Sequence, residues 1–251
     1  MARACFTLSG GKDSNYALYR GVRGGLEPAC LLTLKPRRPD SWMFQVPAVE
    51  LARLQARAMG LEGVHHVRSV SGEREREVEE LASILEEIHS THPFDVLVVG
   101  GLASEYQRRR FQRVAEELGA KLYAPAWGWD PAEYMRALVG EGFRFILVSA
   151  TTMGLDCRHV GRVVDRDLVE DIIRRASRYG FHPALEGGEG ETLVLWQPLY
   201  TRGSLRVRGR LARLGEFECR LEIVEAALAE PGDGGVELLE REPRQPGQEG
   251  V

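Results

Sequence analysis

Cysteine is scarce in this chain, and its spacing argues against two common kinds of site. Four of the 251 residues are cysteines, and no two of them form a C-x-x-C pair. Because zinc ribbons and redox dithiols are built on such pairs, the sequence favours neither. Cys5 and Cys30 fall in apolar runs that we expect to be buried strands, so we expect them to be reduced structural thiols.

Long hydrophobic runs are also absent. The longest, at residues 94–99 and 143–148, are far shorter than the roughly 20 apolar residues that a membrane-spanning helix needs. The first residues of the chain show no cleavable apolar segment either. We therefore expect a cytoplasmic protein without a membrane partner.

Positive charge is not in excess. The chain has 33 lysines and arginines against 37 aspartates and glutamates, a net charge of −4, and its isoelectric point is near 5.9. Nucleic-acid binders usually need basic side chains, because neutralisation of phosphates supplies most of their non-specific affinity. The composition therefore predicts no stable nucleic-acid partner. With 43% hydrophobic and 28% charged residues, it is ordinary for a globular protein.

One hexapeptide near the N-terminus carries the most specific chemistry. It lies between an apolar run and a helical pattern and consists of Ser9, Gly10, Gly11, Lys12, Asp13 and Ser14. The glycines let backbone N–H groups approach an oxyanion, and a helix that begins here adds the partial positive charge of its N-terminus. Lys12 supplies a full charge, and the two serines supply hydroxyl donors. The hexapeptide therefore predicts a phosphate site.

This loop is not a Walker loop. Phe6 stands where a Walker loop has its first glycine, and Asp13 stands where it has Ser or Thr. The string instead resembles the pyrophosphate loop (PP-loop, S-G-G-x-D-S) of ATP pyrophosphatases. That resemblance implies an enzyme that splits ATP between its α- and β-phosphates and releases AMP and pyrophosphate.

The first half of the chain alternates strands and helices. Apolar runs predict five buried strands, at residues 4–8, 29–34, 64–67, 94–99 and 121–124. Helical patterns lie between them, at residues 15–22, 49–59, 75–89 and 104–118. This alternation predicts an α/β fold with a doubly wound, five-stranded parallel sheet. Because ligands bind at the carboxyl ends of such strands, we expect the hexapeptide to meet Gly100 and Gly101, which follow the fourth strand.

The pattern changes in the second half. Helices are expected at residues 132–139 and 168–179, and strands at 143–149, 192–195, 205–211 and 217–226. Asp167 and Glu170 have the spacing of a capping box for the second helix, which ends at Gly180. We therefore expect an ATP-binding domain (1–128), a smaller substrate-binding α+β domain (129–228) and a disordered tail (229–251).

Two further strings offer polar groups. The first combines carboxylates with a glycine scaffold, in Glu186, Gly187, Gly188, Glu189, Gly190, Glu191 and Thr192. It could be a flexible acidic turn, or it could hold Mg²⁺, orient a cationic substrate or accept a proton. The second follows the fourth strand and contains Gly100, Gly101, Ser104, Glu105, Tyr106, Gln107 and Arg108. It is either an exposed helix start or a contact to phosphate or carboxylate through the arginine.

Together with Pro125-x-Trp127-Gly128, these strings resemble the diphthine–ammonia ligase family over about residues 3–200. The resemblance implies an adenine nucleotide α-hydrolase-like α/β domain and a smaller second domain. It also implies ATP-dependent amidation of diphthine, a modified histidine of elongation factor 2, with ammonium. That reaction passes through an acyl-adenylate and yields diphthamide, AMP and pyrophosphate. The chain departs from the family pattern at Gln45, Gly190 and Trp196, where a His, an aromatic residue and an Asp are common.

The resemblance and the chemistry suggest roles for these residues. ATP is expected to contact the hexapeptide and Gly100 and Gly101, with Mg²⁺ sharing the charge of the pyrophosphate. Asp13 either positions Mg²⁺ or caps the helix. The expected catalytic residues are Lys12, Asp13, Glu189 and Glu191, and the two glutamates could bind ammonium and take its proton. The substrate is expected to contact Ser104, Glu105, Tyr106, Gln107, Arg108, Glu186, Gly187, Gly188 and Thr192.

Two other functions stay open on the sequence alone. One is a PP-loop enzyme that modifies tRNA, as an adenylating thiolase or a lysidine-type ligase, which the acidic isoelectric point and the lack of a C-x-x-C pair disfavour. The other is a protein of the same fold that binds ATP without splitting it. All six histidines are expected to be structural, although His182 lies just before the acidic string and could face the site. The sequence does not indicate an oligomeric state.

Overall fold

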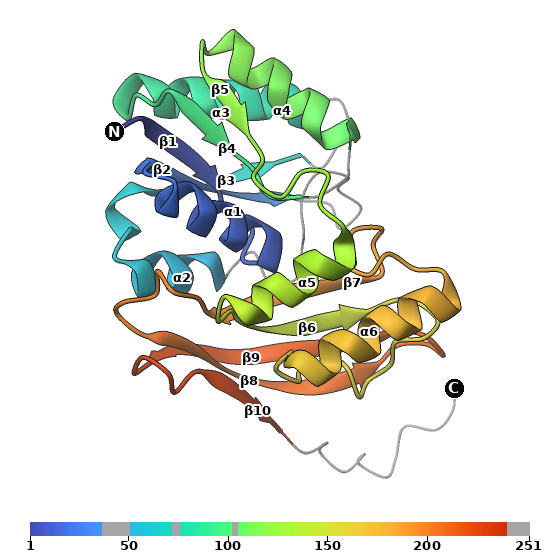
Figure 1. Cartoon of the computed structure of the whole chain (residues 1–251). Coiled ribbons are helices and arrows are strands. Elements are labelled where there is room, and N and C mark those ends of the chain that lie inside the picture. The colour runs from blue at the N-terminus through green and yellow to red at the C-terminus, as the bar shows by residue number, and fades with distance from the viewer. Residues whose placement is uncertain (37–50, 72–75, 102–104, 240–251) are drawn as a thin grey trace, which may run out of the picture.

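The computed structural model describes residues 1–36, 51–71, 76–101 and 105–239, which form two five-stranded sheets (Figure 1). The first sheet has the strand order β3-β2-β1-β4-β5, and the second has the order β10-β8-β9-β6-β7. In Figure 1 the first sheet lies above the second, with α1 and α2 between them.

All strand pairs of the first sheet are parallel. Its strands are β1 (Arg3–Thr7), β2 (Glu27–Pro36), β3 (His65–Val70), β4 (Val96–Val98) and β5 (Lys121–Tyr123). The intervening helices are α1 (Lys12–Arg23), α2 (Ala52–Met59), the short 3₁₀ helix η2 (Glu62–Val64), α3 (Arg76–Thr91) and α4 (Glu105–Glu117). The chain winds outward from β1 to β3 and then to the other side through β4 and β5. The predicted doubly wound parallel sheet is thus confirmed, with its switch point between β1 and β4.

The second sheet is mixed. It contains β6 (Arg144–Ala150), β7 (Gly190–Trp196), β8 (Ser204–Arg213), β9 (Cys219–Ala229) and β10 (Gly235–Leu238). The pairs β6–β7, β6–β9 and β8–β9 are antiparallel, whereas β10 runs parallel to β8. Two helices accompany this sheet, α5 (Pro131–Gly140) and α6 (Arg166–Tyr179). Helices and an antiparallel ladder together make this part α+β, as the sequence predicts.

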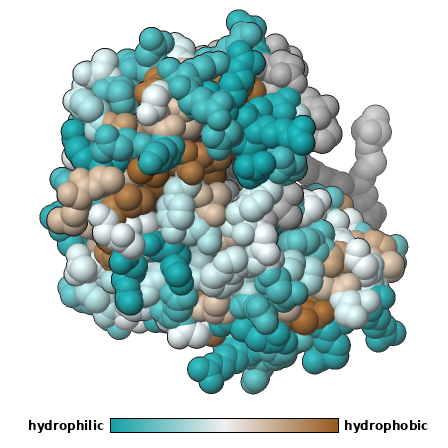
Figure 2. Space-filling model, turned by 45° about the horizontal axis from the view of Figure 1, so that its top comes forward, coloured by the Kyte–Doolittle hydropathy of each residue, from teal (hydrophilic) through white to brown (hydrophobic). Residues whose placement is uncertain are grey.

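Alternation along β1 divides the hydrophobic core into two clusters. Ala4 and Phe6 face the α1 and α2 side, whereas Cys5 faces α3 and α4. The cluster on the α1 side continues without a break into α5, β6, α6 and β7. Hydrophilic side chains cover most of the surface drawn in Figure 2, and hydrophobic ones gather in a band across the upper half of that view. Because one core serves both sheets, the position of α1 is set from both sides.

The start of α6 differs from the sequence prediction. Helix α6 begins at Arg166, and its cap is Asp165, whose carboxylate accepts a hydrogen bond from the Leu168 amide at 2.8 Å. The predicted capping box of Asp167 and Glu170 is therefore wrong, because the Glu170 carboxylate binds Arg136 instead.

The segment predicted as a disordered tail (229–251) is ordered in its first part. Strand β9 runs to Ala229, and β10 follows at Gly235–Leu238. Backbone pairing with β8 and two hydrogen bonds from the Arg144 guanidinium, to the Gly232 and Gly234 carbonyls, hold this polar stretch. Residues 240–251 lie outside the described part of the chain.

The expectation of reduced cysteines is wrong. Cys5 and Cys30 are register partners on β1 and β2, with Cα atoms 4.5 Å apart, and they form a disulfide. A second disulfide joins Cys157 to Cys219, the first residue of β9. Sequence separation hides both pairs, because parallel pairing of β1 with β2 places Cys5 beside Cys30, and the fold brings the loop that contains Cys157 to the start of β9.

We expect the unfolded, unreduced protein to show no reactive thiol and the reduced protein to show four. Removing the Cys157–Cys219 bridge in a C157A/C219A variant releases a 62-residue loop. The loop-entropy model places the resulting loss at about 4 kcal/mol of unfolding free energy. Thiol titration and denaturant unfolding measure the two quantities, and four reactive thiols in the unreduced protein would contradict both bridges.

Candidate active site

The hexapeptide forms the turn from β1 into α1. Helix α1 begins at Lys12, and at its N-cap, Gly11, no side chain caps the helix. Gly10 has a φ of +92°, a conformation that glycine adopts without strain. The hydroxyls of Ser9 and Ser14 lie 3.1 Å apart at the same turn. The predicted anion-binding geometry, a glycine turn at a helix N-terminus with two hydroxyls, is therefore present.

Buried amides hold the carbonyl groups of this turn. The Gly10 carbonyl accepts hydrogen bonds from the Val194 amide of β7 at 3.0 Å and from the Gln55 side chain at 2.9 Å. The Gly11 carbonyl accepts one from the Asn15 side chain at 3.0 Å. Gln55 and Asn15 are fully buried. Because these carbonyls are engaged from the core side, the peptide planes of the turn have a fixed orientation.

The sequence prediction missed this supporting set. Tyr200 belongs to it as well, since its hydroxyl donates to the Asn15 side-chain oxygen at 2.9 Å. One signal was available in advance, because Asn15 is the chain's only asparagine and directly follows the hexapeptide. No local pattern marks Gln55 or Tyr200, which lie 40 and 185 residues away from Asn15.

Gly100 lies directly against the hexapeptide, as predicted. A Cβ atom on Gly100 would lie 2.4 Å from the Asp13 carbonyl carbon and 2.5 Å from the Ser14 nitrogen. Both contacts are to backbone, so the approach is possible only for glycine. Gly101, the next residue, has a φ of +120°. The β1–α1 turn and the end of β4 thus meet at the switch point of the sheet.

Asp13 is held by two partners. The Lys12 ammonium lies 2.8 Å and 3.0 Å from its two carboxylate oxygens, and the Tyr134 hydroxyl donates to Oδ1 at 2.9 Å. The suggestion that Asp13 caps α1 is therefore wrong. Tyr134 is fully buried on α5, and burial together with the Asp13 charge raises the pKa of its hydroxyl well above the usual value. Tyr134 therefore stays protonated and acts as a donor.

The acidic string is folded around Glu189. Its carboxylate accepts hydrogen bonds from the backbone amides of His182 at 2.8 Å and Gly187 at 2.7 Å. A Cβ atom on Gly187 would lie 2.6 Å from Glu189 Oε1, so the glycine makes room for this clamp. Glu186 lies in the same loop, and its charge adds to the elevation of the Tyr134 pKa. Gly188 bonds through its carbonyl to the Thr151 hydroxyl.

The two strings meet at Thr192. Its hydroxyl accepts a hydrogen bond from the Lys12 amide at 3.1 Å, across 180 residues of sequence. Burial lowers the pKa of His182, and the charges of Glu189, Lys12 and Asp13 also act on the imidazole. His182 therefore lies near the place where both strings converge, as its position just before the acidic string suggested.

Strand β7 contains Glu191 and two of the residues at which the chain departs from the family pattern, Gly190 and Trp196. The Glu191 amide donates to the Ser149 hydroxyl at 3.1 Å. A Cβ atom on Gly190 would lie 2.6 Å from the Ser149 carbonyl oxygen, so this backbone accepts no larger residue there. Trp196 is paired with Arg144 at the opposite end of β7 from the acidic string. Gln45 lies outside the described residues.

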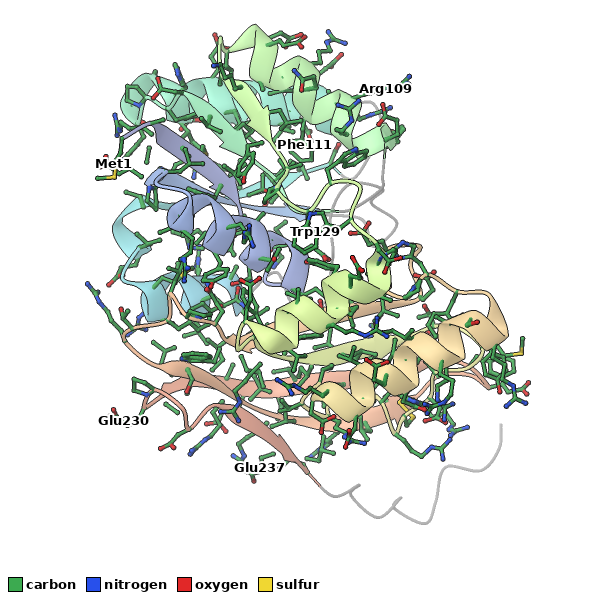
Figure 3. The ribbon with its side chains drawn as sticks, viewed as in Figure 1. Met1, Arg109, Phe111, Trp129, Glu230 and Glu237 are labelled. Atoms are coloured by element: carbon green, nitrogen blue, oxygen red, sulfur yellow. A yellow bond between two sulfur atoms is a disulfide. The ribbon has the colours of Figure 1, made fainter. Side chains whose placement is uncertain are left out.

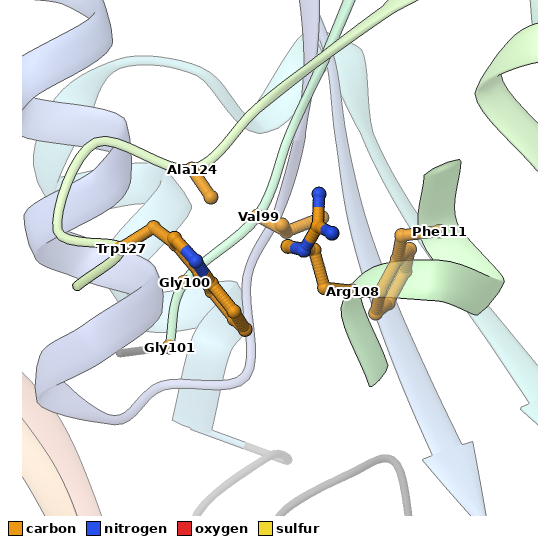
Figure 4. A pocket seen from close by; sticks show the side chains of 7 residues that line it. All are labelled: Val99, Gly100, Gly101, Arg108, Phe111, Ala124 and Trp127. Carbon is orange, nitrogen blue, oxygen red and sulfur yellow. The ribbon is translucent and has the colours of Figure 1, made fainter. Parts of the chain in front are cut away.

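The string that follows the fourth strand contributes the start of α4 and one wall of a pocket. Arg108 pairs with Glu105 at 2.9 Å, and its guanidinium lies over the Trp127 ring, 5.2 Å from the ring centroid. The pocket beside the hexapeptide (Figure 4) is lined by Val99, Gly100, Gly101, Arg108, Phe111, Ala124 and Trp127. The Tyr106 ring is covered by the Arg110 guanidinium. Ser104 and the side chain of Gln107 lie outside the described residues.

No group of three His, Cys, Asp or Glu side chains among the described residues could hold a metal ion. A divalent ion at the hexapeptide would thus rely on Asp13 and on ligand phosphates, which is the usual way in which proteins hold Mg²⁺. In the described part of the chain, no helix combines the length and the hydropathy needed to cross a membrane.

A glycine turn at a helix N-terminus, a glycine packed directly against it and an acidic loop beside it match the arrangement expected of a nucleotide-binding enzyme of the PP-loop class. Family models of the diphthamide synthase N-terminal and C-terminal domains match residues 2–122 and 130–214. The chain therefore belongs to the diphthamide synthase family, and it is an ATP-dependent ligase.

Relatives in other organisms agree with this family. A protein from Danio rerio is 31% identical over 212 residues, which cover 78% of this chain and 82% of that protein. A protein from Homo sapiens is 27% identical over 217 residues (80% and 81%). One from Saccharomyces cerevisiae is 25% identical over 232 residues, covering 80% of this chain and 34% of that longer protein. Each of the three is named diphthine–ammonia ligase.

Replacing Gly100 by alanine should weaken ATP binding by about tenfold or more, which corresponds to ~1.4 kcal/mol. The reason is that the new methyl group forces the end of β4 away from the Asp13 and Ser14 backbone. Gly140→Ala is the matched control, because a Cβ there has no neighbour within 4 Å. Titration calorimetry measures both affinities, with thermal melting as the check on folding. Wild-type affinity in Gly100→Ala would show that this contact does not shape the site.

Proposed function

We propose that this protein amidates diphthine on elongation factor 2, using ATP and ammonium. In the first step a substrate carboxylate oxygen attacks the α-phosphorus of ATP, and the bond from that phosphorus to pyrophosphate breaks. In the second step ammonia attacks the acyl carbon of the acyl-adenylate, the amide forms and AMP leaves. The ammonium ion has given up a proton before this attack.

The observation that carries this proposal is the contact between the hexapeptide and the acidic string. The Lys12 amide bonds to Thr192 at 3.1 Å, so an anion site and a carboxylate loop share one location. A ligase with this chemistry needs both at once, because the phosphate that activates the carboxylate and the ammonium that consumes it must reach the same acyl carbon. The family assignment gives this arrangement its substrate class.

The residues of the hexapeptide suit the pyrophosphate. Ser9, Ser14 and the amides of the turn can donate hydrogen bonds to it, and Lys12 can neutralise the charge that develops as it leaves. Mg²⁺, held by Asp13 and the phosphates, would share that charge when bound.

We assign different roles to Glu189 and Glu191 of the acidic string. Both oxygens of Glu189 accept backbone hydrogen bonds, so its contribution is to hold the loop in shape. We assign ammonium binding and removal of the proton to Glu191, at the start of β7. We assign the substrate to the other polar groups of the acidic string, which are Glu186, Gly187, Gly188 and Thr192. The reaction belongs in the cytoplasm, where elongation factor 2 and ATP are found.

The test is to mix the protein with ATP, Mg²⁺ and ammonium, with and without elongation factor 2 that carries diphthine, and to quantify AMP. We expect AMP only with the modified factor, together with conversion of a carboxylate to an amide in its mass. AMP that forms with tRNA instead would indicate the tRNA-modifying alternative. No AMP with any acceptor, despite ATP binding, would indicate a non-catalytic nucleotide-binding protein.

Within this assay, Lys12→Met should lower the rate of AMP formation by about a hundredfold. Loss of one group that stabilises transition-state charge typically costs 10²–10³-fold. Lys121→Met is the matched control, because Lys121 is exposed on β5 and makes no contact with the hexapeptide among the described side chains. Its rate should stay within about twofold of wild type, since isolated surface substitutions have small effects. Equal rates in the two variants would exclude Lys12 from the reaction.

A further inference from the structure

Tyr134 is the one donor from α5 that reaches the hexapeptide among the described residues. Its hydroxyl lies 2.9 Å from Asp13 Oδ1, across 121 residues of sequence. The same oxygen lies 3.0 Å from the Lys12 ammonium, which contacts Oδ2 at 2.8 Å. The side chains of Lys12 and Tyr134 are both almost fully buried, whereas that of Asp13 keeps 14% of its surface exposed. Asp13 is therefore the member of this group that faces the solvent.

We propose that Tyr134 is a positioning residue for nucleotide and Mg²⁺ binding, which holds the Asp13 carboxylate in place when Lys12 leaves it for a phosphate. This role rests on the proposed function only in its choice of ATP as the nucleotide. If Lys12 were its only partner, the Asp13 carboxylate would be free to follow the ammonium and to remain paired with it. A second donor on a rigid element prevents this and leaves the carboxylate available to a cation. Tyr134 itself cannot touch a ligand, because its side chain has no exposed surface.

The surroundings of Tyr134 fix the position of its hydroxyl. Its ring packs edge-on against Tyr16 at 5.2 Å and against Trp129 at 6.5 Å between ring centroids. Trp129, labelled in Figure 3, lies between α1 and α5. The N-terminus of α5 is capped, because the Asp130 carboxylate accepts hydrogen bonds from the amides of Ala132 and Glu133. The donor that orients Asp13 is thus a rigid part of the helical layer next to the second sheet.

Tyr16 provides a matched control in the same aromatic cluster. It is also fully buried, and its hydroxyl donates to Glu141 at 3.0 Å and not to the hexapeptide. Tyr134→Phe and Tyr16→Phe each remove one buried hydroxyl and keep the ring. A purely structural contribution would therefore appear in both variants, whereas the positioning role belongs to Tyr134 alone.

The readout is the affinity for ATP, measured by calorimetry with and without Mg²⁺ and without any acceptor. In wild type we expect Mg²⁺ to tighten ATP binding. In Tyr134→Phe that gain should shrink by about tenfold, or ~1.4 kcal/mol, while the affinity without Mg²⁺ changes little. Tyr16→Phe should keep the full gain. The double variant Asp13→Asn/Tyr134→Phe should lose no more of the Mg²⁺ gain than Asp13→Asn alone, because both changes remove the same oriented carboxylate.

A full Mg²⁺ gain in Tyr134→Phe, or an equal loss in Tyr16→Phe, would overturn the role of Tyr134. Failure of the proposed function is seen separately, in the AMP assay. A protein that binds ATP with the expected Mg²⁺ gain but makes no AMP would lose the proposed reaction and keep the positioning role. A wild-type protein that binds no ATP under either condition would overturn both.

Discussion

The structure depends on one set of backbone hydrogen bonds, those by which β7 of the second sheet holds the turn after β1. The Val194 amide donates to the Gly10 carbonyl, and the Lys12 amide donates to Thr192. These groups are buried, so removing one partner of such a bond would leave the other unpaired at a cost of about 1–3 kcal/mol. The hydrophobic core on the α1 side also continues from the first sheet into the second and so helps to hold the two together. The turn that we assign to phosphate is therefore built jointly by both halves of the chain.

The sequence predicted some features of the fold well, because they follow from local patterns or from general rules of sheet topology. The five strands of the first sheet follow from short apolar runs, and the meeting of Gly100 with the hexapeptide follows from the topology of a doubly wound sheet. Both inferences use regularities that act locally or that hold for every sheet of this kind. The hexapeptide itself is recognisable because its chemistry lies in consecutive residues.

Other features could not be read from the chain, because they depend on contacts between distant residues. Tyr134 and Gln55 look like ordinary helix residues until folding places them against the turn. The two disulfides depend in the same way on which strands and loops become neighbours. Strand β10 was missed for another reason: it has only four residues and follows a stretch rich in Gly, Pro and Glu, so no hydrophobic run marks it, and pairing with β8 holds it in place.

The Lys12–Asp13 pair has a consequence for selectivity. A lone lysine at a helix N-terminus attracts any small anion, and cells contain millimolar phosphate. Here the ammonium is already neutralised by its neighbour at 2.8 Å, so a stray anion must compete with a carboxylate for it. A nucleotide that arrives with its own divalent cation offers each partner a replacement at the same time. If ATP and Mg²⁺ bind at this turn as proposed, the resting loop discriminates against simple anions in favour of metal-chelated triphosphates before any part of the base or sugar is recognised.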